Sequence, residues 1–212
     1  MQRPVKKILV RASDAPDRAI AILRNGGIVA YPTETFYGLG ADPFNMDAVK
    51  RLFALKGRPP EKPLPLIIKD RPMLSGLVEE VPRPAEILIK RYWPGPLTII
   101  FMAKENVPES ITAGSGKVAV RVSSGEACRL LLEGFNSPLT STSANPSGKA
   151  PARSAGEVLE YFNGSIDLLI DGGGLAGELG STIVDVTGGR PCIVREGAVP
   201  TQEILKALNA PG

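Results

Sequence analysis

Apolar positions along the chain recur with two different spacings, which predicts intermixed helices and strands. Val49, Leu52 and Phe53 follow helical spacing, whereas short runs rich in β-branched residues favour strands. Helices are predicted at residues 14–25, 45–56, 83–92, 126–133, 154–162 and 201–208. Strands are predicted at residues 28–31, 64–68, 97–102, 118–122, 139–143, 166–170, 181–186 and 190–195.

The mixing of these elements indicates an α/β fold in which helices cover a sheet. The short Thr-Gly-Gly turn at 187–189 predicts that strands 181–186 and 190–195 are antiparallel. Pro65 favours an edge position or an irregular start for strand 64–68. We therefore expect a single strongly twisted, mixed parallel and antiparallel sheet flanked by helices.

The length of 212 residues suits one domain, and no shift in composition marks a second. We expect residues 1–212 to form this domain, with a core of about 12–200. No apolar run of about 18 residues and no charged-then-apolar leader occurs, so we expect a cytoplasmic protein without a membrane partner. Cys128 and Cys192 lack the spacing of a metal site or a disulfide framework, and we expect buried or half-buried thiols.

The absence of histidine narrows the possible chemistry more than any other compositional feature. It removes the usual general base, the commonest metal ligand and every Ser-His or Cys-His nucleophile. Any catalysis must use Lys, Arg, carboxylates, hydroxyls, backbone amides or the substrates themselves. The net charge of only +3 does not demand a general polyanion-binding surface, but it allows a local basic cleft.

Cationic residues follow a predicted helix end and two predicted strand ends. Lys56 and Arg58 flank Gly57 at the helix end, with Lys62 four residues later. Arg121 and Arg195 lie at or near strand carboxyl ends, where ligands gather in open α/β sheets. Such cations suit phosphate or carboxylate groups, although the helix dipole alone would also favour cations at a helix end.

Hydroxyl and amide side chains gather near other predicted strand ends, where turn chemistry offers an alternative explanation. They are Thr33, Thr35, Ser141, Thr142, Ser143 and Asn145. The glycines at 172–174 match neither a Walker loop nor a dinucleotide fingerprint, leaving a flexible connection or a ligand role for Ser181 and Thr182 open. The carboxylates Glu34, Asp171 and Asp185 are scattered and form no convincing pair.

Taken together, these segments resemble the YrdC family, whose members act as threonylcarbamoyl-AMP synthases. The matching segments follow the family order and span about residues 15–200; they are 26–42, 56–59, 93–98, 120–122, 143–148, 181–185 and 194–197. The resemblance implies a YrdC/RibB-like fold and a nucleotidyltransferase that makes threonylcarbamoyl-AMP and pyrophosphate from L-threonine, bicarbonate and ATP. A separate transferase complex would then form N6-threonylcarbamoyladenosine (t6A) at position 37 of tRNA.

The resemblance also implies roles for individual residues. Lys56 and Arg58 would be catalytic. ATP would be bound by Arg58, Lys62, Lys117, Ser143, Asn145 and Arg195. Threonine would be bound by Thr35, Arg121, Ser141 and Ser181, with Arg121 the partner of its carboxylate. No protein metal ligand is assigned, and Mg²⁺ is expected to arrive with ATP.

One departure and two alternatives qualify this reading of the residues. Ile67 stands where many longer relatives carry a histidine near threonine, which keeps a family paralogue with a different substrate open. A direct RNA-binding role is a second alternative, although aromatic residues make up only 5% and no stacking platform is evident. Because the chain ends soon after the core, we expect no linked second domain of the kind that some relatives carry.

Overall fold

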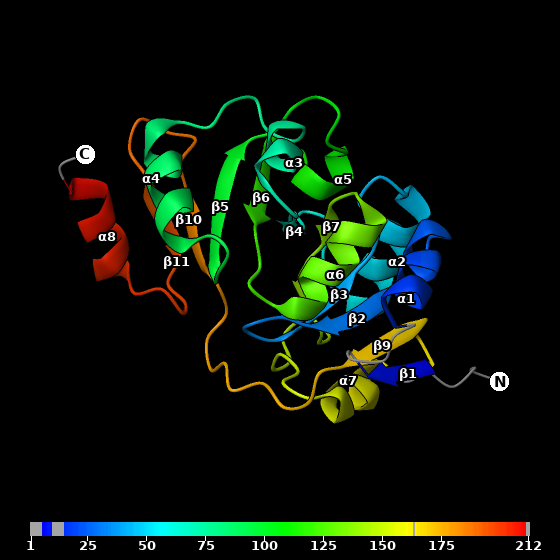
Figure 1. The fold of residues 1–212 in the computed structure, drawn as a ribbon. Helices are drawn as coiled ribbons and strands as arrows, with labels where there is room; N and C mark the ends of the chain where they lie inside the picture. The colour runs from blue at the N-terminus through cyan, green and yellow to red at the C-terminus, as the bar shows by residue number, and fades with distance from the viewer. Residues whose placement is uncertain (1–5, 10–14, 163, 211–212) are drawn as a thin grey trace.

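The computed structural model describes residues 6–9, 15–162 and 164–210, and its strands form two mixed sheets (Figure 1). The first sheet has the order β1 (Lys6–Leu9), β9 (Leu168–Asp171), β2 (Val29–Pro32), β3 (Tyr37–Gly40), β8 (Thr142–Ser143). The second has the order β11 (Cys192–Arg195), β10 (Thr182–Asp185), β5 (Leu97–Met102), β6 (Lys117–Arg121), β4 (Leu66–Ile67), β7 (Leu139–Thr140). The predicted mixture of parallel and antiparallel pairs is confirmed, but it is divided between two sheets.

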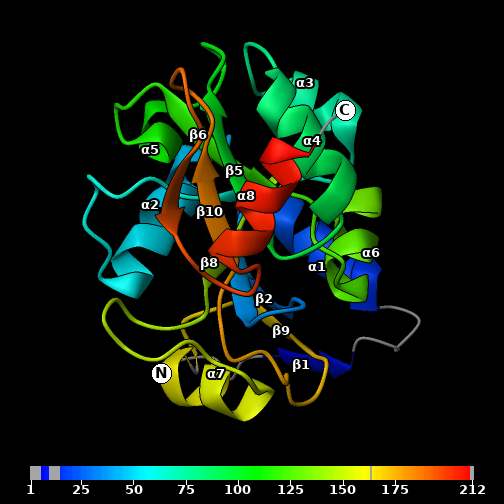
Figure 2. The same ribbon diagram turned by 90° about the vertical axis from the view of Figure 1, so that its left-hand side faces the viewer.

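Helices cover both sheets, as the sequence predicts. They are α1 (Ala15–Arg24), α2 (Met46–Lys56), α3 (Arg71–Ser75), α4 (Arg83–Tyr92), α5 (Glu109–Thr112), α6 (Glu126–Phe135), α7 (Ala155–Phe162) and α8 (Thr201–Asn209). α1 packs on α6, and their apolar faces share one buried cluster with β2 and β9. α4 and α8 lie side by side next to the second sheet (Figure 2). No helix in the described ranges is long and apolar enough to cross a membrane.

The chain passes from one sheet to the other at Ser141, where the sequence predicts one continuous strand. β7 pairs with β4, whereas β8 pairs with β3 two residues later. Of the two alternatives for strand 64–68, the edge position is wrong, because β4 lies between β6 and β7. The pairing begins only at Leu66, in agreement with an irregular start. Pro65 is tolerated because it precedes the two paired residues, and its carbonyl still accepts a hydrogen bond from the Ser141 amide at 2.7 Å.

Strand β3 is missed by the hydrophobic pattern because two of its four residues are glycine. It forms an antiparallel hairpin with β2. A Cβ atom at Gly40 would lie 2.6 Å from the Tyr31 ring, so glycine allows the hairpin to pack on that buried side chain. The pattern also misses β1 and the short helices α3 and α5. Ser13, a plausible N-cap for the helix predicted at 14–25, lies outside the described residues.

Helix α2 has the predicted ends, and these place the first candidate cations. The Asn45 side chain accepts hydrogen bonds from the amides of Asp47 and Ala48. Gly57 ends the helix in the left-handed conformation, with φ of 56°. Lys56 is therefore the last helical residue, and the chain turns sharply before Arg58.

The two cysteines differ from each other in exposure. Cys128 is buried in α6, as predicted, and burial raises the pKa of its thiol to about 12. Cys192 is exposed at the start of β11, so the prediction of a buried or half-buried thiol is wrong there. The reason is topological: β11 is an edge strand, and all four of its residues are at least partly exposed.

Candidate functional site

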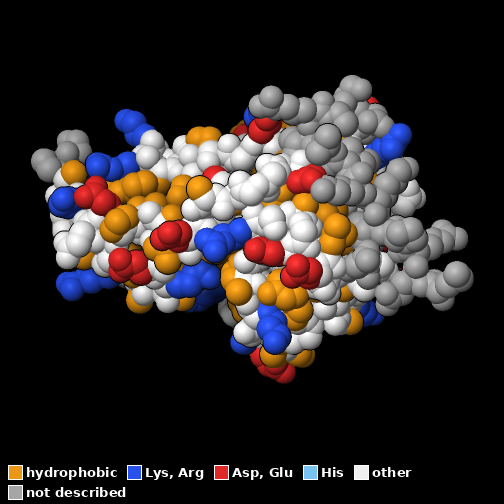
Figure 3. Space-filling view, turned by 90° about the horizontal axis from the view of Figure 1, so that it is seen from below, with side chains coloured by type: hydrophobic (Ala, Val, Ile, Leu, Met, Phe, Trp, Pro, Cys, Tyr) orange, Lys and Arg blue, Asp and Glu red, His pale blue; other side chains and the backbone are white. Residues whose placement is uncertain are grey.

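A cavity of about 690 Å³ lies where the two sheets meet. Its wall combines the β2–β3 turn, the segment after α2, the crossing at 141–143 and the ends of β6, β10 and β11. Figure 3 shows a group of blue Lys and Arg side chains near the middle of the face seen from below. Predicted site residues that line the cavity are Thr35, Arg58, Lys62, Arg121, Ser141, Ser143, Ser181 and Arg195. Lys56, Lys117 and Asn145 do not line it.

Arg58 is held at the cavity wall by the loop that follows α2. Its Nε donates to the Lys62 carbonyl at 3.2 Å, and Nη2 donates to the Pro63 carbonyl at 2.7 Å. Partial burial lowers the pKa of Arg58 from its ordinary value, but an arginine side chain remains charged at any ordinary pH. The loop therefore presents a fixed, partly desolvated cation to the cavity.

Lys56 occupies a different place from Arg58, because its ammonium group lies behind the cavity wall. Its side chain is buried, and Nζ donates to the carbonyl oxygens of Ser143 at 2.5 Å and Asn145 at 2.6 Å. These bonds connect the end of α2 to the chain just after β8. In this structure Lys56 fixes the backbone next to Ser143, which itself lines the cavity.

Asn145 is also buried and shapes the same loop. Its Nδ2 group donates to the carbonyls of Pro146 at 2.9 Å and Lys149 at 2.7 Å. Its Oδ1 atom is buried and has no partner among the described residues. Segments 56–58 and 143–145 thus meet in space. Arg58 and Ser143 line the cavity, whereas Lys56 and Asn145 do not.

The buried ammonium of Lys56 makes stability depend on pH, and Lys56→Met should remove this effect. Burial first, and the charge of Arg58 second, lower the pKa of Lys56 to about 7. An unfolded lysine keeps its proton to about pH 10, so between these values the unfolded state binds more protons. The free energy of unfolding should therefore rise with pH, by at most about 1.4 kcal/mol per pH unit. The two carbonyl acceptors favour the charged form and reduce that slope.

Urea denaturation at about pH 6 and about pH 9 measures this effect. The exposed Lys50, on the same helix, provides the control: Lys50→Met should keep the pH dependence of the wild type. If wild type and Lys56→Met differ in unfolding free energy by the same amount at both pH values, the lowered pKa is wrong.

Arg121 lies at the end of β6 and forms a buried ion pair that crosses between the sheets. Its Nη1 group is 2.5 Å from Oε1 of Glu34, in the β2–β3 turn. The second Glu34 oxygen accepts a hydrogen bond from the Ser123 hydroxyl. The side chains of Arg121 and Glu34 are only 8% and 15% exposed. Glu34, which the sequence pattern leaves among scattered carboxylates, is thus linked to a candidate threonine-binding residue.

Hydroxyl groups of the cavity wall belong to two local networks. Thr33 Oγ1 lies 3.0 Å from Thr35 Oγ1, accepts from the Thr35 amide and donates to the Phe36 carbonyl at 2.8 Å. Ser181 Oγ lies 2.8 Å from Thr98 Oγ1. Turn chemistry therefore positions Thr33, while Thr35 lies beside it on the wall. Thr33 and Thr98 also line the cavity, and their only signal in the sequence is proximity to predicted strand ends.

Arg195 packs across Ser181 at another part of the wall. Its Nη2 donates to the Ser181 carbonyl at 2.7 Å and lies 3.4 Å from Ser181 Oγ. Burial and the nearby charge of Arg121 lower the pKa of Arg195. Both guanidinium groups therefore belong to the same cationic part of the wall. Thr182, in contrast, bonds to the backbone of residues 197 and 199 and has a structural role.

Lys117 lies at the opposite end of β6 from Arg121 and is paired with an acid. Its Nζ is 2.9 Å from Oδ2 of Asp185. Both side chains are partly exposed; Lys117 is two residues from Ala119 and Asp185 two residues from Ile183, and Ala119 and Ile183 line the cavity. Lys117 would have to leave Asp185 to contact a ligand in the cavity.

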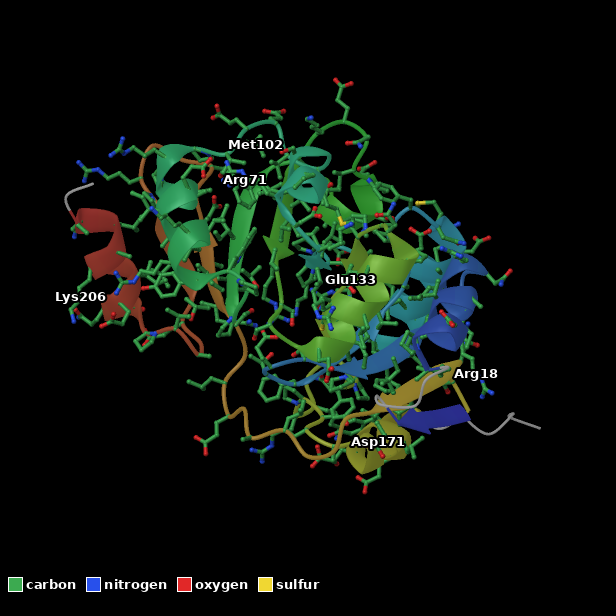
Figure 4. All side chains as sticks on the ribbon, in the orientation of Figure 1. Arg18, Arg71, Met102, Glu133, Asp171 and Lys206 are labelled. Carbon is green, nitrogen blue, oxygen red and sulfur yellow. The ribbon has the colours of Figure 1, made fainter. Side chains whose placement is uncertain are left out.

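The glycine-rich segment after β9 runs along the cavity as part of its wall. It follows Asp171, which is labelled in Figure 4, and contributes residues 178–180 to the lining. The Tyr37 hydroxyl accepts from the Gly172 amide and donates to the Gly173 carbonyl. A Cβ atom at Gly177 would lie 2.3 Å from the Thr35 carbonyl oxygen, so glycine permits close approach here.

Position 67 faces the core. Ile67 is only 1% exposed and belongs to the apolar cluster between α1, α6 and the sheets. Its neighbours Pro65 and Leu66 line the cavity, whereas Ile67 does not. The departure at this position therefore leaves the polar part of the cavity wall intact in this chain.

The chain is similar to several known proteins of one family. A family model described as "Telomere recombination", for the Sua5, YciO and YrdC proteins, matches residues 21–197. Threonylcarbamoyl-AMP synthase of Pyrococcus abyssi is 44% identical over 191 residues, which cover 90% of this chain but only 56% of that relative. Threonylcarbamoyl-AMP synthase of Halorhodospira halophila is 45% identical over 159 residues, covering 74% of this chain and 83% of that relative.

A solved structure of Sua5 from Pyrococcus abyssi in complex with L-threonine is also similar. It is 40% identical, with a TM-score of 0.92, and the match covers 98% of this chain and 61% of the solved one. The present chain thus spans little more than half the length of its Pyrococcus abyssi relative. The family model extends over the segments that build the cavity. The chain therefore belongs to the Sua5/YciO/YrdC family.

Proposed function

We propose that this chain is an L-threonylcarbamoyladenylate synthase, which makes threonylcarbamoyl-AMP and pyrophosphate from L-threonine, bicarbonate and ATP. One observation carries the proposal: a single cavity combines two groups of residues with different chemistry. Arg121 with the hydroxyls of Thr35, Ser141 and Ser181 suits an amino acid. Arg58 and Lys62 suit phosphates. The names of the relatives, and the threonine bound to the Pyrococcus abyssi protein, support the same assignment.

The proposed reaction has two bond-forming steps and needs no protein nucleophile. The threonine amine attacks the carbon of bicarbonate, and loss of water gives a carbamate. A carbamate oxygen then attacks the α-phosphorus of ATP; the bond to the β-phosphate breaks and pyrophosphate leaves. Both partners of the second step are anions, so catalysis rests on neutralising their charge and aligning them, which suits a chain without histidine.

Arg58 is the cation best placed for the second step, because it lines the cavity in a fixed orientation. Lys56 and Asn145 would act one layer further out, by holding the backbone beside Ser143. Arg195 would take part from the side of Ser181. Lys117 contributes to ATP binding in this proposal only if its pair with Asp185 opens.

Magnesium belongs to the nucleotide in this proposal. The described residues contain no group of three or more His, Cys, Asp and Glu side chains that could hold a metal ion. The acidic residues of the cavity wall are Glu178 and Glu196. Mg²⁺ bound mainly by phosphate oxygens and water fits such a site, and it would neutralise part of the charge on the leaving pyrophosphate.

Pyrophosphate release is the direct test. With MgATP and bicarbonate, the protein should release pyrophosphate only when L-threonine is added, and mass spectrometry should find threonylcarbamoyl-AMP. Release with another amino acid but not threonine would indicate a paralogue with a different substrate. No release, together with tight RNA binding that weakens steeply with salt, would favour the RNA-binding alternative. If the proposal holds, a downstream transferase would use the product on tRNA.

A further inference from the structure

Glu34 is a buried carboxylate that the proposed reaction does not use. It lies at the turn between β2 and β3, on the first sheet, while its partners Arg121 and Ser123 belong to the second sheet and the segment after it. It does not line the cavity, whereas Arg121 does. The Arg121–Glu34 pair is the most buried ion pair among the described residues, because both of its side chains are less than a fifth exposed. Any effect of Glu34 on a ligand must therefore pass through Arg121.

The contact with Glu34 divides the donors of Arg121. A guanidinium has five N–H donors in a rigid plane, and the bond to Glu34 uses one of the two on Nη1. Among the described residues, Nε and Nη2 of Arg121 donate to no acceptor. Neither of these two atoms is among the buried atoms that lack a hydrogen-bond partner. Because Arg121 lines the cavity, these are the donors left for a ligand. Glu34 thus fixes which edge of the guanidinium a carboxylate can use.

Glu34 also changes the net charge of this part of the cavity wall. Arg121 and Arg195 line the same cavity, and the charge of Arg121 contributes to the lowered pKa of Arg195. With Glu34 in place the three side chains carry a net charge of about +1, and without it about +2. A corner of charge +1 suits a ligand with a single carboxylate beside an amine. A corner of charge +2 would favour dianions, because two unopposed cations attract them more strongly.

We propose that Glu34 is a positioning residue that orients Arg121 and sets its net charge, so that the cavity selects a zwitterionic amino acid over a dicarboxylate. The inference rests on the proposed function, because it identifies the corner as the threonine subsite. Ser123 assists by holding the second oxygen of Glu34. In this arrangement one acid determines both the geometry and the specificity of the subsite.

Glu34→Gln tests the inference, because it keeps the size of the side chain and removes its charge. Binding of L-threonine and of malonate, a dicarboxylate probe, is measured by calorimetry on the intact chain, and KM for threonine and ATP is measured by pyrophosphate release. The ratio of threonine affinity to malonate affinity should fall about tenfold or more, while KM for ATP changes less than about twofold. Glu86→Gln, which removes an acid paired with an exposed arginine, Arg71, should leave the ratio unchanged. Arg71 lies well away from the β2–β3 turn (Figure 4).

A second variant separates position from charge. Ser123→Ala removes one contact to Glu34 but keeps the charge, so KM for threonine should rise while the affinity for malonate stays near that of the wild type. An unchanged selectivity ratio in a folded Glu34→Gln protein would overturn the inference. If Glu34→Gln does not fold, an unchanged KM for threonine in Ser123→Ala overturns it instead.

The two proposals fail in different ways. A wild-type protein that binds threonine but releases no pyrophosphate refutes the proposed function, and the binding ratio still tests Glu34. An active enzyme whose ratio is insensitive to Glu34→Gln refutes the role of Glu34 alone. A wild-type protein that does not bind threonine refutes both.

Discussion

Arg58→Ala should reduce threonine-dependent pyrophosphate release by about a hundredfold or more and leave the protein folded. The physical reason is that an oriented cation facing charge that develops in the transition state contributes on the order of 10²-fold or more to the rate. The fold should survive, because the side chain is only partly buried and its two hydrogen bonds go to a surface loop. Their loss costs about 1 kcal/mol of unfolding free energy. Initial rates at saturating threonine and MgATP, together with urea denaturation, measure both quantities.

Arg24→Ala is the matched control for this experiment. Arg24 also donates to a backbone carbonyl, that of Gly134 at 2.9 Å, but it lies on α1 away from the cavity. The Arg24→Ala protein should lose a similar amount of unfolding free energy and keep its activity. Arg58→Lys should recover only part of the rate, because lysine supplies a point charge without the planar pair of donors. A folded Arg58→Ala protein with a rate within about threefold of the wild type would contradict a role in catalysis.

Arg121→Met should lower the free energy of unfolding by about 3 kcal/mol and abolish saturation by threonine. Removing one partner leaves the carboxylate of Glu34 buried without its countercharge, and breaking a buried pair in this way typically costs about 3–5 kcal/mol. We expect the lower end, because the Ser123 hydroxyl still bonds to Glu34. Urea denaturation gives the stability, and the dependence of pyrophosphate release on threonine concentration gives the effect on binding.

The double variant Glu34→Gln with Arg121→Met distinguishes the ion pair from general packing. Removing both charges should recover much of the stability that Arg121→Met loses, because no unpaired charge remains. Threonine binding should remain impaired, since Arg121 is absent. If the double variant is as unstable as the sum of the two single variants, the two side chains do not interact and the ion pair is wrong.

The sequence predicts most of the elements because their caps and periodicity agree. Helices α2 and α4 and strand β5 occur where the pattern places them, and α2 ends before Gly57 as predicted. The same agreement places Arg58 and Arg121 at the ends of elements. The separation into two sheets could not be predicted, because the chain changes partner strand without a break in the pattern: β7 pairs with β4, and β8, just after Ser141, pairs with β3. Periodicity records which residues alternate, but not which partner strand they meet.

Most residues that line the cavity could be expected from the sequence, but not which of the predicted residues lie behind its wall. Lys56 and Arg58 are two residues apart, yet the left-handed Gly57 between them directs one ammonium behind the wall and one guanidinium along it. Glu34 was missed because its partner is 87 residues away in the sequence. Long-range ion pairs leave no local pattern, so only the folded chain can reveal them.

The exposed thiol of Cys192 also makes the protein convenient for fluorescence work. The sequence contains two cysteines, and the other is buried in α6 with a raised pKa, so a maleimide dye should attach at Cys192 alone. Cys192 does not line the cavity, but it lies three residues before Arg195, which does. A dye at this position would label the strand that carries Arg195 without lining the cavity and without an engineered cysteine.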